Sequence, residues 1–181
     1  HGDRCAGHYA NWLTGQVDDV DVLRSRENLI PAPEYSAPQA YRTRVPPELH
    51  STAYVAARGR EFLERHVASG EDAPFFLQVS FPDPHHPWDP PISEITRCNW
   101  RDLELPDAFP GSVEDTIKIL EQKPRHWLDW YLGHKQFAYE VPKNFVPAQM
   151  STDQIREVNA MCHIENELID EALGRVLGHI N

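Results

Sequence analysis

Two adjacent histidines, His85 and His86, are the residues whose type and position most favour chemistry. They follow an apolar, largely aromatic run at 75–81, and prolines stand on either side of them. A short apolar run bounded by prolines predicts a strand that is buried on both faces, as in a parallel sheet. Ligands of α/β proteins bind beyond the carboxyl ends of such strands, so an imidazole at this position is a candidate ligand contact.

The prolines predict a rigid loop at 82–91 that fixes the direction of each side chain. Consecutive side chains of an extended backbone point to opposite sides, so we expect only one of the two histidines to face a ligand. The alternative for His85 is that it only packs within the loop. Trp88 also has two interpretations: it lines a substrate pocket, or it anchors the loop as a buried aromatic side chain.

Other groups of chemically capable residues are weaker candidates. His163 and Glu167 have a spacing that metal sites use on one helix face, but no third ligand accompanies them, so a solvated face is the better interpretation. The three cysteines form neither a disulfide framework nor a zinc motif. An aromatic cluster at 127–139 predicts a packed cap or, alternatively, a surface for a carbohydrate or aryl substrate. Its members are Trp127, Trp130, Tyr131, Phe137 and Tyr139.

Four helices are expected to position these residues. Apolar periodicity and capping residues predict them at 52–68, 112–122, 124–138 and 152–179, the last of which starts with a capping-box pattern. The run at 75–81 is the one confident strand. A strand buried on both faces needs neighbours that the chain does not supply, so we expect this sequence to be an incomplete part of a larger domain.

Composition limits the classes of function. The chain has 181 residues, of which 40% are hydrophobic and 25% are charged, which suffices for one domain with a core. Its net charge of −11 argues against binding nucleic acid through phosphates, because such binding needs a basic surface. No apolar run approaches the length of a membrane span.

Three motifs together resemble the sulfatase family of the alkaline-phosphatase-like superfamily. Residues 74–91 read PFFLQVSFPDPHHPWDPP, similar to the family's P-F-F-L-x-x-S-F strand that runs into P-H-x-P. The preceding helix contains ARGREFL at 57–63, which resembles the family's helix at that place. Residues 169–177 read IDEALGRVL, similar to the family's I-D-x-x-I-G-R-V-L helix. The resemblance covers 51–91 and 151–180 well, and the first fifty residues only weakly.

The resemblance implies a fold, an activity and a site. Residues 1–181 would be a partial sulfatase catalytic domain, the helix-rich middle portion of a three-layer α/β/α domain. His85 matches the family's substrate-contacting histidine, which would stabilise the negative charge that develops as a sulfate monoester is cleaved. His86 and Trp88 are the candidate substrate-binding residues beside it.

The departures from the family pattern concern the nucleophile and the metal. Sulfatases use a formylglycine made from Cys or Ser in C/S-x-P-x-R, and no cysteine here has proline two residues later. The stretch Ser36–Ala40 has alanine where the motif requires arginine. The family's carboxylates for a divalent cation, calcium by family, are missing as well. We therefore expect the nucleophile and the metal site to lie outside this chain, and the chain alone to be inactive.

Two alternatives remain open at this point. A phosphonate or phosphate monoester hydrolase of the same superfamily would share the site. A helical protein-binding or scaffold domain, with its proline-rich and aromatic loops on a partner, would be no enzyme at all. In either case the unpaired edges of strand 75–81 should recruit other chains and lead to oligomers.

Overall fold

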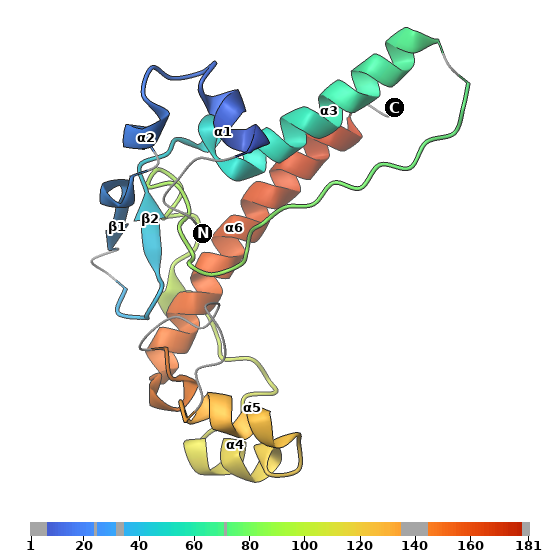
Figure 1. The fold of residues 1–181 in the computed structure, drawn as a ribbon. Helices are drawn as coiled ribbons and strands as arrows, with labels where there is room; N and C mark the ends of the chain where they lie inside the picture. The colour runs from blue at the N-terminus through green and yellow to red at the C-terminus, as the bar shows by residue number, and fades with distance from the viewer. Residues whose placement is uncertain (1–6, 24, 32–34, 71, 135–144, 179–181) are drawn as a thin grey trace.

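The computed structural model describes residues 7–23, 25–31, 35–70, 72–134 and 145–178. One long helix, α6, crosses the molecule, and the other elements lie along it (Figure 1). The fold is rich in helix and has a single small sheet in its described part. The helices are α1 (His8–Leu13), α2 (Val20–Leu23), α3 (Ser51–Ser69), α4 (Val113–Leu120), α5 (Arg125–Tyr131) and α6 (Thr152–Leu177), and short 3-10 turns occupy Arg26–Asn28, Pro47–Leu49, Trp100–Asp102 and Pro147–Gln149. None of the described helices combines the length and the apolar character that crossing a membrane requires.

Helix α6 begins at the predicted capping box. Ser151 Oγ accepts a hydrogen bond from the Gln154 backbone N–H at 3.1 Å, and Gln154 Oε1 accepts one from the Ser151 N–H at 3.0 Å. These bonds satisfy two backbone donors at the helix start. The apolar stripe of the helix is buried, with Met161 and Ile164 fully inaccessible to solvent. The helix predicted at 152–179 is therefore confirmed, with its end at Leu177.

Helix α3 packs against the C-terminal half of α6 (Figure 1). It runs over Ser51–Ser69, as predicted from 52–68, and ends where Gly70 adopts a left-handed conformation with φ of 67°. Gly59 lies at this contact: a Cβ there would stand 3.5 Å from Val79 and 3.6 Å from Val176, which are ordinary van der Waals distances. The chain after α3 thus turns back over the seam between the two helices.

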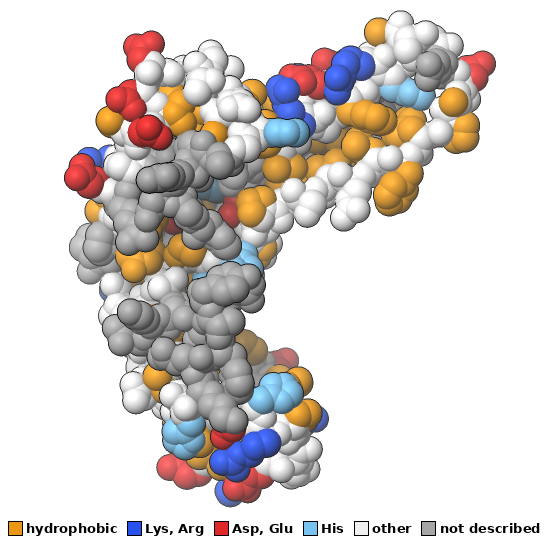
Figure 2. All heavy atoms as spheres, in the orientation of Figure 1, with side chains coloured by type: hydrophobic (Ala, Val, Ile, Leu, Met, Phe, Trp, Pro, Cys, Tyr) orange, Lys and Arg blue, Asp and Glu red, His pale blue; other side chains and the backbone are white. Residues whose placement is uncertain are grey.

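The strand predicted at 75–81 is not formed. The segment is extended in Figure 1 but pairs with no strand among the described residues, whose sheet consists of β1 (Leu29–Pro31) antiparallel to β2 (Tyr41–Thr43). Leu77 and Phe81 pack on the α3–α6 pair, whereas Phe76 is 89% exposed. The prediction was wrong because an apolar run becomes a strand only when a neighbouring backbone offers hydrogen bonds. Figure 2 shows apolar side chains gathered along the arm that α3, the end of α6 and the extended segment form.

The helical pair after the second proline-rich stretch is shorter than predicted. Ser112 caps α4 by accepting a hydrogen bond from the Asp115 N–H at 3.0 Å. The helix predicted at 124–138 appears as α5, which ends at Tyr131, and Gly133 follows with φ of 73°, a conformation that no right-handed helix continues through. Residues 135–138 of that prediction lie outside the described residues.

Candidate active site

The loop at 82–91, which carries the candidate histidines, is held at its start by α3. Thr52 Oγ1, in the first turn of α3, donates a hydrogen bond to Asp83 Oδ2 at 2.7 Å. His50 Nδ1 lies 3.7 Å from the same oxygen. His50 and Thr52 are buried, and the Asp83 side chain is 11% exposed. This buried contact fixes the point at which the loop leaves the extended segment.

The other end of the loop is held by the core. The Trp88 backbone N–H donates to Gln39 O at 3.0 Å, and the Tyr41 N–H donates to Trp88 O at 2.8 Å. The Trp88 ring is buried in the main apolar cluster, and its Nε1–H donates to Pro84 O at 3.1 Å. This environment agrees with the interpretation of Trp88 as a loop anchor. Its contact with a substrate stays a prediction.

His85 and His86 lie between these two anchors, and their rings stack. The ring centroids are 4.3 Å apart with an interplanar angle of 22°, and His85 Nδ1 lies 2.6 Å from His86 O. His85 is exposed and His86 is half-buried. The expectation that the two side chains diverge was wrong, because residues 83–87 form turns and bends instead of an extended backbone. The two rings therefore lie together, and His85 is the more exposed of them.

Beneath the loop, α6 presents a buried glutamate. Glu165 is 1% exposed, and its Oε1 accepts a hydrogen bond from the Asp89 backbone N–H at 2.9 Å. Its Oε2 is buried and has no hydrogen-bond partner in the described structure. Burial, and next to it the charge of Asp83, raises the pKa of the Glu165 carboxyl to about 9. Glu165 is therefore a neutral acid at pH 7.

The sequence contained a signal for Glu165 that the predictions did not use. This residue follows Met161 by four positions and precedes Leu168 by three, so it belongs to the apolar stripe of α6. A glutamate on a buried stripe must be paired, hydrogen-bonded or neutral. Glu157, one turn before Met161, carries the same signal. The contact between His50 and Asp83 had no such signal in the sequence, since it depends on how the start of α3 packs against the loop.

The thiols and acidic residues do not form a second reactive centre in the described part of the chain. Burial raises the pKa of the Cys162 thiol to about 11 and also raises that of Cys98, so both are poor nucleophiles. No group of three or more His, Cys, Asp or Glu side chains is arranged to hold a metal ion among the described residues. His163 and Glu167 are exposed, and Glu167 lies 3.6 Å from Arg97, as befits a solvated helix face.

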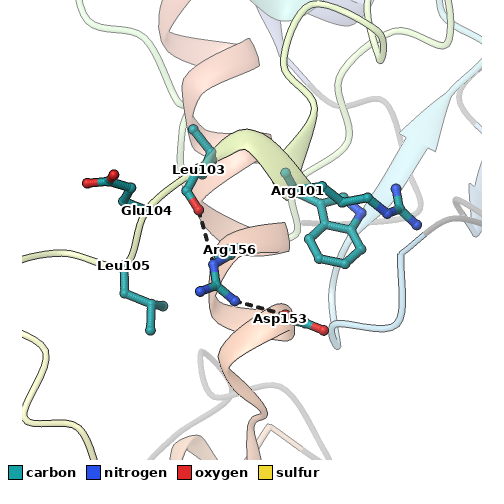
Figure 3. Close-up of a pocket in the computed structure, with 7 residues that line it drawn as sticks. Arg101, Leu103, Glu104, Leu105, Asp153 and Arg156 are labelled. Atoms are coloured by element: carbon teal, nitrogen blue, oxygen red, sulfur yellow. Dashed lines mark hydrogen bonds and ion pairs between the residues drawn. The ribbon is translucent and has the colours of Figure 1, made fainter.

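A hollow of about 450 Å³ with mixed polar and apolar lining lies beside the start of α6 (Figure 3). Arg156 spans it: Nε donates to Leu103 O at 3.0 Å, and Nη1 pairs with Asp153 Oδ1 at 2.9 Å. The guanidinium is thus used to tie the chain after the Trp100–Asp102 turn to α6. We assign this hollow a structural role.

An apolar hollow of about 560 Å³ lies on the α4–α5 pair. Trp127 is 50% exposed and Trp130 is 40% exposed, so the predicted aromatic cluster is partly open to solvent. Trp130 stands 6.4 Å from Phe145, which in turn stands 6.5 Å from Trp88, between ring centroids. The cluster therefore connects to the loop anchor through one ring. Phe137 and Tyr139 lie outside the described residues.

Comparison with known proteins gives no information about the function of the loop. Neither protein-family models nor curated proteins match this chain. What the structure brings together is a pair of stacked histidines, one of them exposed, on a loop that is held at both ends and backed by a neutral buried acid. An arrangement of this kind can present imidazole N–H groups to an anionic ligand.

Proposed function

We propose that this chain is part of a sulfatase-like hydrolase that cleaves sulfate monoesters, and that the 82–91 loop brings His85 to the sulfate group. The observation that carries the proposal is the placement of an exposed imidazole between two fixed points, Asp83 and Trp88. A donor to developing negative charge is effective only when it is held before the reaction begins. The P-H-x-P pattern supports the same role for His85.

The hydrogen bond of His85 determines the form in which it can act. A backbone carbonyl only accepts, so the Nδ1 atom that contacts His86 O must carry a hydrogen. If Nε2 is also to donate, the ring must hold both hydrogens and a positive charge. We infer that His85 donates a ring N–H hydrogen bond to a sulfuryl oxygen or to the leaving oxygen, and that His86 stacks behind it.

The proposed parent needs a nucleophile and a cation that this chain does not provide. The described carboxylates and histidines do not fit a metal site. The formylglycine and the calcium ion of the family would come from segments that pair with or surround the extended run at 75–81. The exposure of Phe76 and the unpaired backbone of that run, within the described structure, support such neighbours. We propose in addition that the full-length parent has a three-layer α/β/α architecture, of which this chain forms the middle portion.

The test compares the two histidines in the full-length protein. We expect His85→Ala to reduce kcat/KM for an aryl sulfate by about 10²–10³, the typical effect of losing one preorganised donor. His86→Ala should reduce it roughly tenfold or less. Circular dichroism serves as the folding control for both variants. Equal losses, or a larger loss for His86→Ala, would contradict the assignment of His85.

The nature of the substrate is tested in the same protein. A phosphonate or phosphate monoester that is turned over faster than the matched sulfate would favour the neighbouring activity of the superfamily. The isolated 181-residue chain should show no turnover of an aryl sulfate with calcium, because the nucleophile is missing. Turnover by the chain that survives repurification would contradict the division of the site.

A protein-binding function is the second candidate, and one observation favours it. Phe75 and Phe76 are exposed beside a backbone that pairs with no described strand, and an edge of this kind accepts a strand from another chain. The two functions differ in the coding sequence upstream. A C/S-x-P-x-R motif there supports the hydrolase, whereas its absence supports the binding domain.

A further inference from the structure

Two glutamates of α6 are buried to a similar degree but are used differently. Glu157 is 3% exposed, and its Oε2 accepts the backbone N–H of Ser36 at 2.7 Å and that of Ala37 at 2.6 Å. The Ser36 hydroxyl lies 3.3 Å from both oxygens. Donors thus surround Glu157, as suits a charged carboxylate. Glu165, two turns further along, receives one backbone N–H and leaves one oxygen without a hydrogen-bond partner in the described structure.

The groups that face Glu165 explain this difference. The negative charges of Asp83 and Asp89 in the loop act on Glu165, and the charge of Glu165 acts on Cys162 of its own helix. Asp83 also lies 3.7 Å from His50 Nδ1, and burial lowers the pKa of the His50 imidazole, an effect that the Asp83 charge opposes. No cation is among these groups, so the surroundings of Glu165 disfavour a charge and favour a neutral acid. A neutral carboxyl can still accept the Asp89 N–H.

We propose that Glu165 is a positioning residue, whose buried carboxyl group holds the 82–91 loop and through it the imidazole of His85. The geometry carries this role, because Glu165 Oε1 accepts the backbone N–H of Asp89, which follows the loop anchor Trp88 directly. The carboxyl group therefore holds the loop at the end that follows the histidines. The role deepens the proposed function, on which it depends only for the identity of His85 as the substrate contact.

The variants are chosen to separate hydrogen bonding, charge and volume. Glu165→Gln keeps a carbonyl acceptor for the Asp89 N–H and removes the ionisable proton. Glu165→Leu keeps most of the volume and leaves that N–H without an acceptor. Glu157→Leu is the matched control, since it removes an equally buried carboxyl from the same helix but frees the loop at 36–37 instead.

Amide hydrogen exchange and steady-state kinetics of the full-length protein provide the readouts. With Glu165→Leu, we expect exchange of the amides in 82–91 to become at least about tenfold faster. We also expect kcat for an aryl sulfate to fall roughly ten- to a hundredfold, as for lost supporting contacts elsewhere, with little change in KM. Glu165→Gln should restore both values. Glu157→Leu should speed exchange at 36–37 and leave that of 82–91 unchanged.

The outcomes separate this inference from the proposed function. Wild-type exchange of the 82–91 loop in Glu165→Leu, or failure of Glu165→Gln to restore it, overturns the positioning role. Equal loosening of the 82–91 loop by Glu157→Leu also overturns it, because the effect would then be general destabilisation. A wild-type protein that cleaves no sulfate ester contradicts the proposed function, while the exchange measurement still decides the role of Glu165.

Discussion

The two halves of α6 lie in contrasting surroundings. The half around Met161 and Ile164 is covered by the 35–40 segment, the Trp88 loop and the chain near Ile95, and its inward side chains are inaccessible to solvent. The half from Ala172 onward is covered by α3 and one extended segment, and Leu173 and Leu177 are exposed. We call the first half the finished half, because other segments cover its apolar side chains. We call the second the open half, because some of its apolar side chains remain exposed to solvent. The candidate loop therefore packs on the half of α6 whose apolar side chains are fully covered.

Loss of volume should be most costly in the finished half. Ile164→Ala removes three carbons from a side chain that is fully buried, and we expect it to lower the free energy of unfolding by about 2–5 kcal/mol. The matched change in the open half, Leu173→Ala, should cost about 0.5 kcal/mol or less, since that side chain is 37% exposed. Urea unfolding of both variants measures the difference. Equal costs would show that the two halves are equally packed.

The contribution of Glu165 to the free energy of unfolding should depend on pH. The pKa of Glu165 is raised to about 9 from an unfolded value near 4.5, so the unfolded chain releases this proton at a lower pH than the folded chain. Stability from this group is complete below pH 4.5, falls as pH rises toward 9, and is constant above that. At pH 7 the free energy of unfolding is lower by on the order of 3 kcal/mol than it would be without this pKa shift.

Glu165→Gln should remove this dependence. We expect the variant to be more stable than the wild type at pH 7 and equal to it near pH 4, as measured by urea unfolding across this range. The Glu157→Gln control should show no gain at pH 7, because the donors around that carboxylate favour its charge. A wild-type protein that gains stability between pH 5 and 9 relative to Glu165→Gln would refute the neutral form of Glu165.

The seam of the open half should tolerate one additional methyl group. A Cβ at Gly59 meets Val79 and Val176 at ordinary contact distances, and alanine favours a helix over glycine by about 1 kcal/mol. We therefore expect Gly59→Ala to raise the melting temperature slightly and Gly59→Leu to lower it, because the longer side chain has to displace Val79. Destabilisation by alanine would mean that the seam is tighter than these distances indicate.

The open half should also control self-association. Phe76→Ser removes an apolar side chain that is 89% exposed, so its effect on the free energy of unfolding should stay within about 0.5 kcal/mol. We expect the wild-type chain to form oligomers through the unpaired segment and the variant to form fewer. Light scattering after size exclusion gives the masses. A monomeric wild-type chain with a sharp, high-temperature unfolding transition would contradict this expectation.

The sequence predicted the helices well because their signals are local. The capping box at 151–154 and the Gly70 stop depend on residues within one turn of the helix end, and both are found where expected. The run at 75–81 failed because pairing depends on a partner elsewhere. The short elements before residue 50, α1, α2, β1 and β2, were not predicted, since three to six residues give no measurable period.

The candidate site was predicted in part. The pattern of prolines pointed to a fixed loop at 82–91, and the structure places firm contacts at both of its ends. The stacking of His85 and His86 could not be foreseen, because it depends on the turn between them. Glu165 and Asp89 are 76 residues apart in the sequence, and His50 precedes the loop by a whole helix, so their meeting is a result of tertiary structure.

The extended segment at 72–81 has a consequence for how the protein is cut. Endoproteases bind their substrates as extended chains, and they need several consecutive residues without secondary structure. Most residues from Asp72 to Ser80 are exposed, and their backbone pairs with no described strand. A first nick should therefore separate α3 from the histidine loop. Any strand that covers this segment in a larger assembly would also protect it from cleavage.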